Sequence, residues 1–188
     1  RFWRVITGSK RALISVTLAA VLSVSAILYV TNLSLPANAL TTKCTLSIFT
    51  GSVDVIVPGT NDIQPGIDGM TLDTGNRVKT SVDSPALLTF FDGSTLKLEP
   101  GTDIEIEHLE RNDDQQTINI VLKQWTGKTW SHVVKMVDRR FHYEIKTPSA
   151  IALVRGTQFF TEVDQSGTTK VLTTEGLVSV SAQGEEIF

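Results

Sequence analysis

The side chains that most often carry chemistry in proteins, histidine and cysteine, are few and widely spaced in this chain. His108, His132 and His142 are the only histidines, and none lies close in sequence to another or to Cys44, the only cysteine. Metal sites usually bring such ligands together at short, regular spacings. The chain also lacks a phosphate-binding loop, a Gly-x-Ser-x-Gly nucleophile motif and a dinucleotide-binding fingerprint. We therefore predict a non-enzymatic protein with no metal, cofactor or small-molecule substrate.

Acidic residues form the densest group of potential ligands. Asp103, Glu105 and Glu107 alternate with isoleucines, so their carboxylates would share the outward face of a strand. The acidic residues between positions 103 and 114 lack the central glycine and the alternating oxygen ligands of a calcium loop. We interpret this stretch as a solvated, charged sheet edge, and Glu105 and Glu107 as possible contacts for a partner protein.

A single arginine interrupts the apolar segment at residues 147–163, TPSAIALVRGTQFFTEV. Alternation predicts one extended strand in which Arg155 lies between apolar neighbours on the same face. A guanidinium in such a place needs several hydrogen-bond partners, and Gly156 beside it would let another chain segment approach closely. We predict that Arg155, Gly156 and Thr157 form a structural anchor; a role for Arg155 in binding a ligand or partner is the alternative.

Two tryptophans flank a glycine in the segment QWTGKTW. Residues 124–129 read as a turn around Gly127, with Lys123 and Lys128 near the two aromatic rings. Trp125 and Trp130 either pack into the sheet or form an exposed contact patch, because tryptophan beside cations is typical of protein interfaces. We predict that at least one of them touches another protein.

The elements that must position these residues are strands. From residue 45 onward, apolar and polar residues alternate over short segments separated by Gly and Pro turns, such as Asp92-Gly93 and Pro100-Gly101. This pattern predicts an all-β domain at residues 45–188, either a compact β-sandwich or a short β-solenoid of stacked hairpins.

An uncharged, mostly apolar segment at residues 12–35 is long enough to form one transmembrane helix. The basic flank at residues 1–11 predicts a cytoplasmic N-terminus, so the β-domain would lie outside the cytoplasm, beyond a tether at residues 36–44. The alternative is a signal peptide that is cleaved after Ala39.

Charge is divided unevenly along the chain. Arg1, Arg4, Lys10 and Arg11 precede the apolar segment, and the other 13 basic residues stand against all 20 acidic ones, which leaves −7 on the remainder. An acidic domain lacks the basic footprint of a nucleic-acid binder. The expected partners are therefore the membrane and other protein subunits.

Five blocks of the sequence, in order, resemble the FecR domain over about residues 50–182. They are GSVDV at 51–55; Leu72, Gly75 and RVKT at 77–80; SPA at 84–86 with FFDGS at 90–94 and LKL at 96–98; TP at 147–148, Ala150, Ala152 and VRGT at 154–157 with Phe159; and GTTKV at 167–171 with EG at 175–176 and Val178.

The resemblance implies that the domain functions by binding a partner protein and not by catalysis. Proteins with a FecR domain often act as signal transducers, in which an outer domain senses a partner, one helix crosses the membrane and a cytoplasmic part controls a sigma factor. Only about ten residues precede the apolar segment, too few for such a cytoplasmic domain, so either that domain has been cut off or the protein does not signal in this way. A second hypothesis is therefore an accessory subunit docked on a larger membrane complex or cell-surface assembly.

Overall fold

Alternating apolar and polar residues build this domain from strands. The computed structural model describes residues 42–60, 62–112, 116–136 and 140–182, and in these residues there are fourteen strands and no helix. In chain order the strands are β1 Cys44–Ile48, β2 Val53–Ile56, β3 Ile63–Pro65, β4 Thr71–Leu72, β5 Arg77–Thr80, β6 Ala86–Phe90, β7 Thr95–Leu98, β8 Asp103–Asn112, β9 Thr117–His132, β10 Arg140–Lys146, β11 Ala150–Val154, β12 Gln158–Val163, β13 Thr169–Glu175 and β14 Val178–Ala182. The predicted all-β class is confirmed for this part of the chain.

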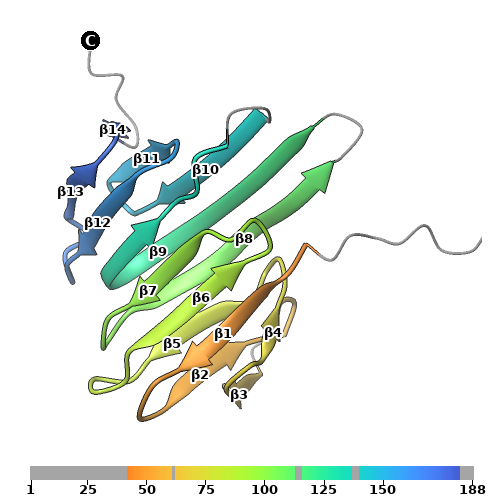
Figure 1. Cartoon of the computed structure of the whole chain (residues 1–188). Helices are drawn as coiled ribbons and strands as arrows, with labels where there is room; N and C mark the ends of the chain where they lie inside the picture. The colour runs from red at the N-terminus through yellow and green to blue at the C-terminus, as the bar shows by residue number, and fades with distance from the viewer. Residues whose placement is uncertain (1–41, 61, 113–115, 137–139, 183–188) are drawn as a thin grey trace, which may run out of the picture. The chain divides into compact units, whose positions relative to one another are not determined.

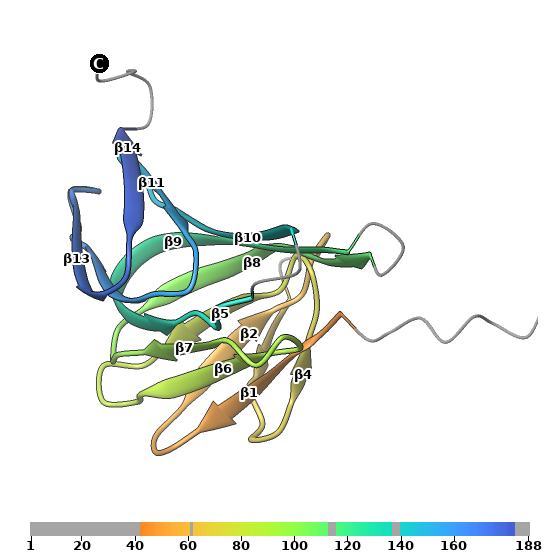
Figure 2. The ribbon, with the colours of Figure 1, turned by 45° about the horizontal axis from the view of Figure 1, so that its top comes forward.

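The strands belong to one hydrogen-bonded sheet that curls into two layers (Figures 1 and 2). The first layer contains β2, β3, β5, β8, β10, β11 and β14, and the second contains β1, β4, β6, β7, β12 and β13. Pairing is antiparallel except between β9 and β10, which run parallel. The domain thus has the two layers expected of a sandwich, but its layers are continuous with each other.

The long strand β9 belongs to both layers. Its first half pairs with β8 and β10, and its second half pairs with β7 and β12. The strand changes layer at Gly127, where φ is +94° and an added Cβ would lie 2.4 Å from the Cα of Thr102. Even-numbered residues such as Gln124 point inward before the corner, and odd-numbered residues such as Thr129 point inward after it. The predicted turn at residues 124–129 is therefore wrong: the strand bends and continues.

The side-chain amide of Gln124 holds this corner from inside the domain. Its Nε2 donates to the backbone oxygen of Gly127 at 2.9 Å and to that of Thr161 at 3.4 Å. Its Oε1 accepts a hydrogen bond from the Thr129 hydroxyl at 3.0 Å. On the other side of the bend, the Thr102 hydroxyl donates to the Lys128 backbone oxygen at 3.0 Å. Both ends of a fully buried amide are therefore paired, which is what burial of such a group requires.

An apolar core fills the space between the layers. Its largest fully buried members include Tyr143, Phe159, Leu46, Leu88, Leu96, Ile104 and Ile120, which come from both layers. The Tyr143 ring meets the rings of Phe90 and Phe159 edge-on, at centroid distances of 6.2 and 6.4 Å. This core lies within the unit Leu40–Phe188, which therefore has the core of its own that independent folding requires.

The predicted turns at Asp92-Gly93 and Pro100-Gly101 are confirmed. Gly93 and Gly101 have φ of +88° and +71°, and Gly93 lies in the hairpin between β6 and β7. Asp92 stabilises this hairpin by accepting hydrogen bonds from the backbone N–H and the hydroxyl of Ser94, at 3.0 and 2.6 Å.

The predicted membrane segment at residues 12–35 and its basic flank lie outside the described residues, as does most of the tether. Within the part of the chain that the structure describes, no helix is long and apolar enough to cross a membrane. The membrane anchor stays a prediction from the sequence.

Burial of Cys44 and Tyr143 makes the stability of the domain sensitive to alkali. The Cys44 side chain is 1% exposed, and burial raises the pKa of its thiol from 9.0 to about 12. Burial also raises the pKa of the Tyr143 hydroxyl. Because both groups lose protons more readily after unfolding, their contribution to stability is complete below pH 9 and falls as the pH rises toward the folded-state pKa.

We therefore expect the free energy of unfolding to fall between about pH 8 and about pH 10.5, with about 2 kcal/mol of the loss due to Cys44. Urea denaturation at the two pH values measures this. In Cys44→Ala the difference between the two pH values should be smaller. An equal difference in the variant would show that the thiol is not responsible.

Candidate functional site

The outward face of the first layer carries paired charges of both signs. Arg77 on β5 donates from Nε and Nη2 to the two carboxylate oxygens of Asp103 on β8, at 2.6 and 2.7 Å. The Nζ of Lys79 lies 3.1 Å from the same carboxylate. A bidentate arginine–carboxylate pair fixes the geometry of both side chains. Both carboxylate oxygens of Asp103 are therefore occupied by contacts within the sheet.

The two glutamates predicted as partner contacts are also surrounded by cations. Glu105 lies opposite both Arg77 and Lys123 in the strand register, and Glu107 forms an ion pair with the Nζ of Lys146 at 3.0 Å. Their strand, β8, pairs with β9 on one side, and on the other side its residues Asp103–Glu105 pair with β5, so the predicted charged edge is wrong at Glu105. The carboxylates instead contribute to cross-strand charge pairs, which favour this register of the sheet.

Trp125 is packed into this charged face. Its ring lies 4.7 Å from the guanidinium carbon of Arg77 and 4.0 Å from the Nζ of Lys123. Cations at this distance from an indole ring are attracted by its π-electrons. Trp125 is half-buried, and these contacts stabilise the first layer.

Trp130 lies in the other half of β9, on the outward face of the second layer. Its ring contacts that of Phe160 on β12 at a centroid distance of 4.8 Å, and Leu172 on β13 lies next to Phe160 in the register. Trp130 is 42% exposed and Leu172 51% exposed. We call these three residues the Trp130 row. The structure does not join Trp125 and Trp130 into one patch, because the corner at Gly127 puts them in different layers.

Arg155 is exposed and lies in the turn that links β11 in the first layer to β12 in the second. The prediction of a single strand through residues 147–163 with a buried arginine is therefore wrong. The inward face changes parity at this turn, since Val154 and Thr157 are both buried. Among the described residues the Arg155 guanidinium has no hydrogen-bond or ion-pair partner.

Gly156 and Thr157 give this turn its shape. Gly156 has φ of +61°, and an added Cβ would lie 2.8 Å from the Cβ of Lys135. Thr157 is buried, and its backbone oxygen accepts a hydrogen bond from the N–H of Val133 at 2.9 Å. The turn is thus held against residues 133–135. A structural role for Gly156 and Thr157 fits this geometry and stays a prediction.

Two of the three histidines are paired with carboxylates on their own strands. His108 Nε2 lies 3.3 Å from Glu110, and His142 Nε2 lies 2.8 Å from Glu144. No group of three or more potential metal-ligating side chains occurs within the described ranges. The one thiol, Cys44, is buried and its pKa is raised, which makes it a poor nucleophile.

A family model described as FecR protein matches residues 76–179, which is more than half of the chain and extends from β5 into β14. The chain belongs to the FecR family. The match is narrower than the resemblance predicted for residues 50–182, and it includes the turn at Arg155, the corner of β9 and the Trp130 row. No curated protein and no solved structure matches the chain significantly. FecR proteins are a regulatory family, which agrees with the absence of catalytic motifs in this sequence.

Sequence reasoning missed Phe160 and Leu172. The adjacent pair Phe159-Phe160 was a usable signal, because neighbouring residues of a strand point to opposite faces and only one ring could enter the core. Phe159 is fully buried and Phe160 is the outward member. The pairing of Phe160 with Trp130 depends on β9 and β12 being neighbours, and no local pattern in the sequence shows that.

The turn at Gly156 should tolerate alanine less well than another left-handed turn. Gly156→Ala adds backbone strain and a contact with Lys135, whereas Gly59→Ala adds strain alone, since φ at Gly59 is +74° and nothing lies within 4 Å of the added Cβ. We expect Gly59→Ala to cost about 1 kcal/mol and Gly156→Ala clearly more. Chemical denaturation of both variants measures this; equal losses would mean that the turn is not held by residues 133–135.

Proposed function

We propose that this FecR domain is the extracytoplasmic contact domain of a membrane-anchored signal transducer that regulates a sigma factor. Membership of the FecR family supports the regulatory role. The basic flank and the apolar segment at residues 12–35 support a single anchor with the domain outside the cytoplasm. The structural observation that supports contact with another protein is the exposed Trp130 row.

The Trp130 row has the composition of a binding surface. An exposed tryptophan stacked on a phenylalanine and followed by a leucine is apolar, and its side chains lose little conformational freedom on binding. Around it lie side chains that already have partners, such as the Lys128–Glu162 ion pair at 3.1 Å and the Lys97–Glu99 pair at 2.7 Å. An apolar centre with a charged rim is the usual arrangement of a protein interface.

The position of β13 in the sheet leaves the Trp130 row accessible to a partner protein. Among the strands of the described residues, β13 pairs with β12 alone, so the row ends at an edge of the second layer. A partner can therefore reach Leu172 from the face and from the side. Trp125 and the carboxylates of the first layer are poorer candidates for a partner contact, because they already contact cations of the same layer.

Trp130→Ala should remove the partner while leaving the domain folded. Truncation of an exposed interface tryptophan typically costs about 2 kcal/mol or more of binding free energy. We expect loss of the protein that co-purifies with the full chain from native membranes in mild detergent, together with a melting temperature close to that of the wild type. Trp125→Ala serves as the control, since Trp125 contacts Arg77 and Lys123 within the sheet and should affect melting more than co-purification.

Site-specific photo-crosslinking identifies the partner. A photoreactive side chain at position 172 should crosslink it in intact cells, and the same group at Val82, which is 90% exposed on another turn, should not. A sigma factor that co-purifies with the full protein supports the relay. A stable membrane complex without a sigma factor supports the accessory-subunit alternative. Unchanged co-purification in Trp130→Ala would rule out the Trp130 row as the contact.

A further inference from the structure

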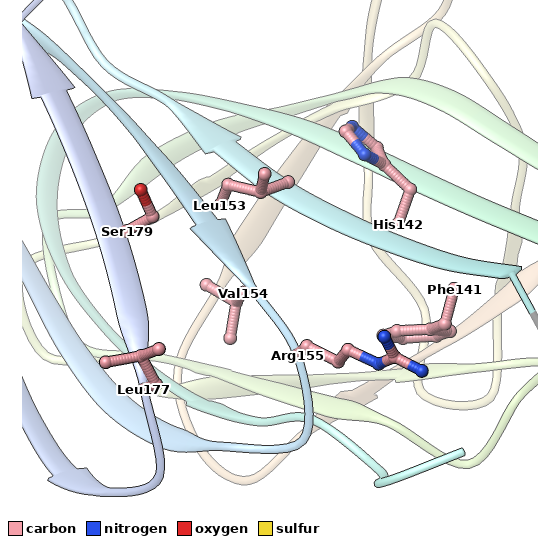
Figure 3. Close-up of a pocket in the computed structure, with 7 residues that line it drawn as sticks. All are labelled: Phe141, His142, Leu153, Val154, Arg155, Leu177 and Ser179. Carbon is pink, nitrogen blue, oxygen red and sulfur yellow. The ribbon is translucent and has the colours of Figure 1, made fainter. Parts of the chain in front are cut away.

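A pocket of about 390 Å³ opens beside Arg155, where β10, β11 and β14 lie next to one another (Figure 3). Its apolar lining comes from Phe141, Leu153, Val154 and Leu177. Leu153 and Leu177 are 43% and 81% exposed. The volume lies within the range of about 300–1,000 Å³ typical of small-ligand sites. Apolar side chains thus face solvent across a concave surface that a ligand of modest size can fill.

The polar part of the pocket has one fixed positive charge. Arg155, His142 and Ser179 complete the lining, and no carboxylate belongs to it among the described residues. The nearest acid on β10, Glu144, is already engaged, since it accepts from His142 at 2.8 Å and lies 3.9 Å from the Nζ of Lys146. The Arg155 side chain lines the pocket with its guanidinium beside Phe141 (Figure 3), and no acid among the described lining residues occupies its donors. A guanidinium fork matches the two oxygens of a carboxylate.

From this arrangement we propose that the pocket binds a monocarboxylate attached to an apolar group, with the carboxylate on Arg155 and the apolar group between Leu153 and Leu177. One fixed cation balances one negative charge, and the apolar lining favours a hydrophobic acid over a multiply charged phosphate. This chemistry occurs in two sources: the C-terminal residue of a peptide that ends in an apolar side chain, and a medium-chain fatty acid. The site is separate from the Trp130 row, which lies in the other layer.

The test uses the isotope-labelled fragment of residues 42–188, which contains the whole core. Octanoate, N-acetyl-alanyl-leucine and the C-terminal amide of that dipeptide are titrated while the backbone amide signals are recorded by NMR. We expect saturable shifts in β10, β11 and β14 with an acid, and binding of the amide at least about tenfold weaker, because it lacks the charge-assisted hydrogen bonds. A tighter dipeptide identifies a peptide terminus as the source, and a tighter octanoate identifies a fatty acid.

Arg155→Gln should weaken binding of the better acid at least about tenfold. Lys170→Gln, which removes the same charge from an exposed position on β13, should not change it. Leu177→Ser tests the apolar end and should also weaken binding; since Leu177 is largely exposed, this variant should keep the fold. The proposal is overturned if neither acid gives saturable shifts, if the amide binds as well as the acid, or if Arg155→Gln binds as well as the wild type.

Discussion

The buried amide of Gln124 holds the corner on which the rest of this domain depends. β9 pairs with four strands, two in each layer, and the change from one layer to the other takes place within the few residues that Gln124 bridges. Within the part of the chain that the structure describes, the strands that follow β9 join the sheet through it alone: β10, β11 and β14 extend the first layer, and β12 and β13 extend the second. A change in the corner would therefore move both groups of strands.

The two candidate binding surfaces, the Trp130 row and the pocket beside Arg155, lie on different groups of these strands. The Trp130 row runs from β9 across β12 to β13, and the pocket lies over β10, β11 and β14. The turn at Arg155 and Gly156 connects the groups, because the chain leaves β11 in one layer there and enters β12 in the other. Residues 154–157, which belong to one of the five blocks that resemble the FecR domain, thus lie at a crossing between layers. This placement explains how Gly156 and Thr157 can serve the fold while the neighbouring Arg155 faces solvent.

Much of the fold could be predicted from local pattern. Alternating residues placed the strands, and Asp92-Gly93 and Pro100-Gly101 marked turns that need positive φ. The errors at residues 124–129 and 147–163 arose where the inward face changes from even-numbered to odd-numbered residues or back, at Gly127 and again at Gly156. On both sides of these glycines the residues still alternate, so a continuous strand, a bend and a layer change look alike in sequence. What separates them is long-range: the close approach of Thr102 to Gly127 and of Lys135 to Gly156. The exposure of Arg155 and the separation of the two tryptophans follow from these two glycines.

The most direct test of this account is the stability of Gln124→Leu compared with Gln158→Leu. Leucine fills a similar volume at position 124 but leaves the backbone oxygens of Gly127 and Thr161 and the Thr129 hydroxyl without their partner. The account predicts a loss of at least about 2–3 kcal/mol in the free energy of unfolding, with hydrogen-exchange protection falling in both layers together. Gln158 is exposed, and the same substitution there should change little. An unfolding free energy for Gln124→Leu close to that of the wild type, or protection lost in one layer alone, would contradict the claim that this corner holds the two layers together.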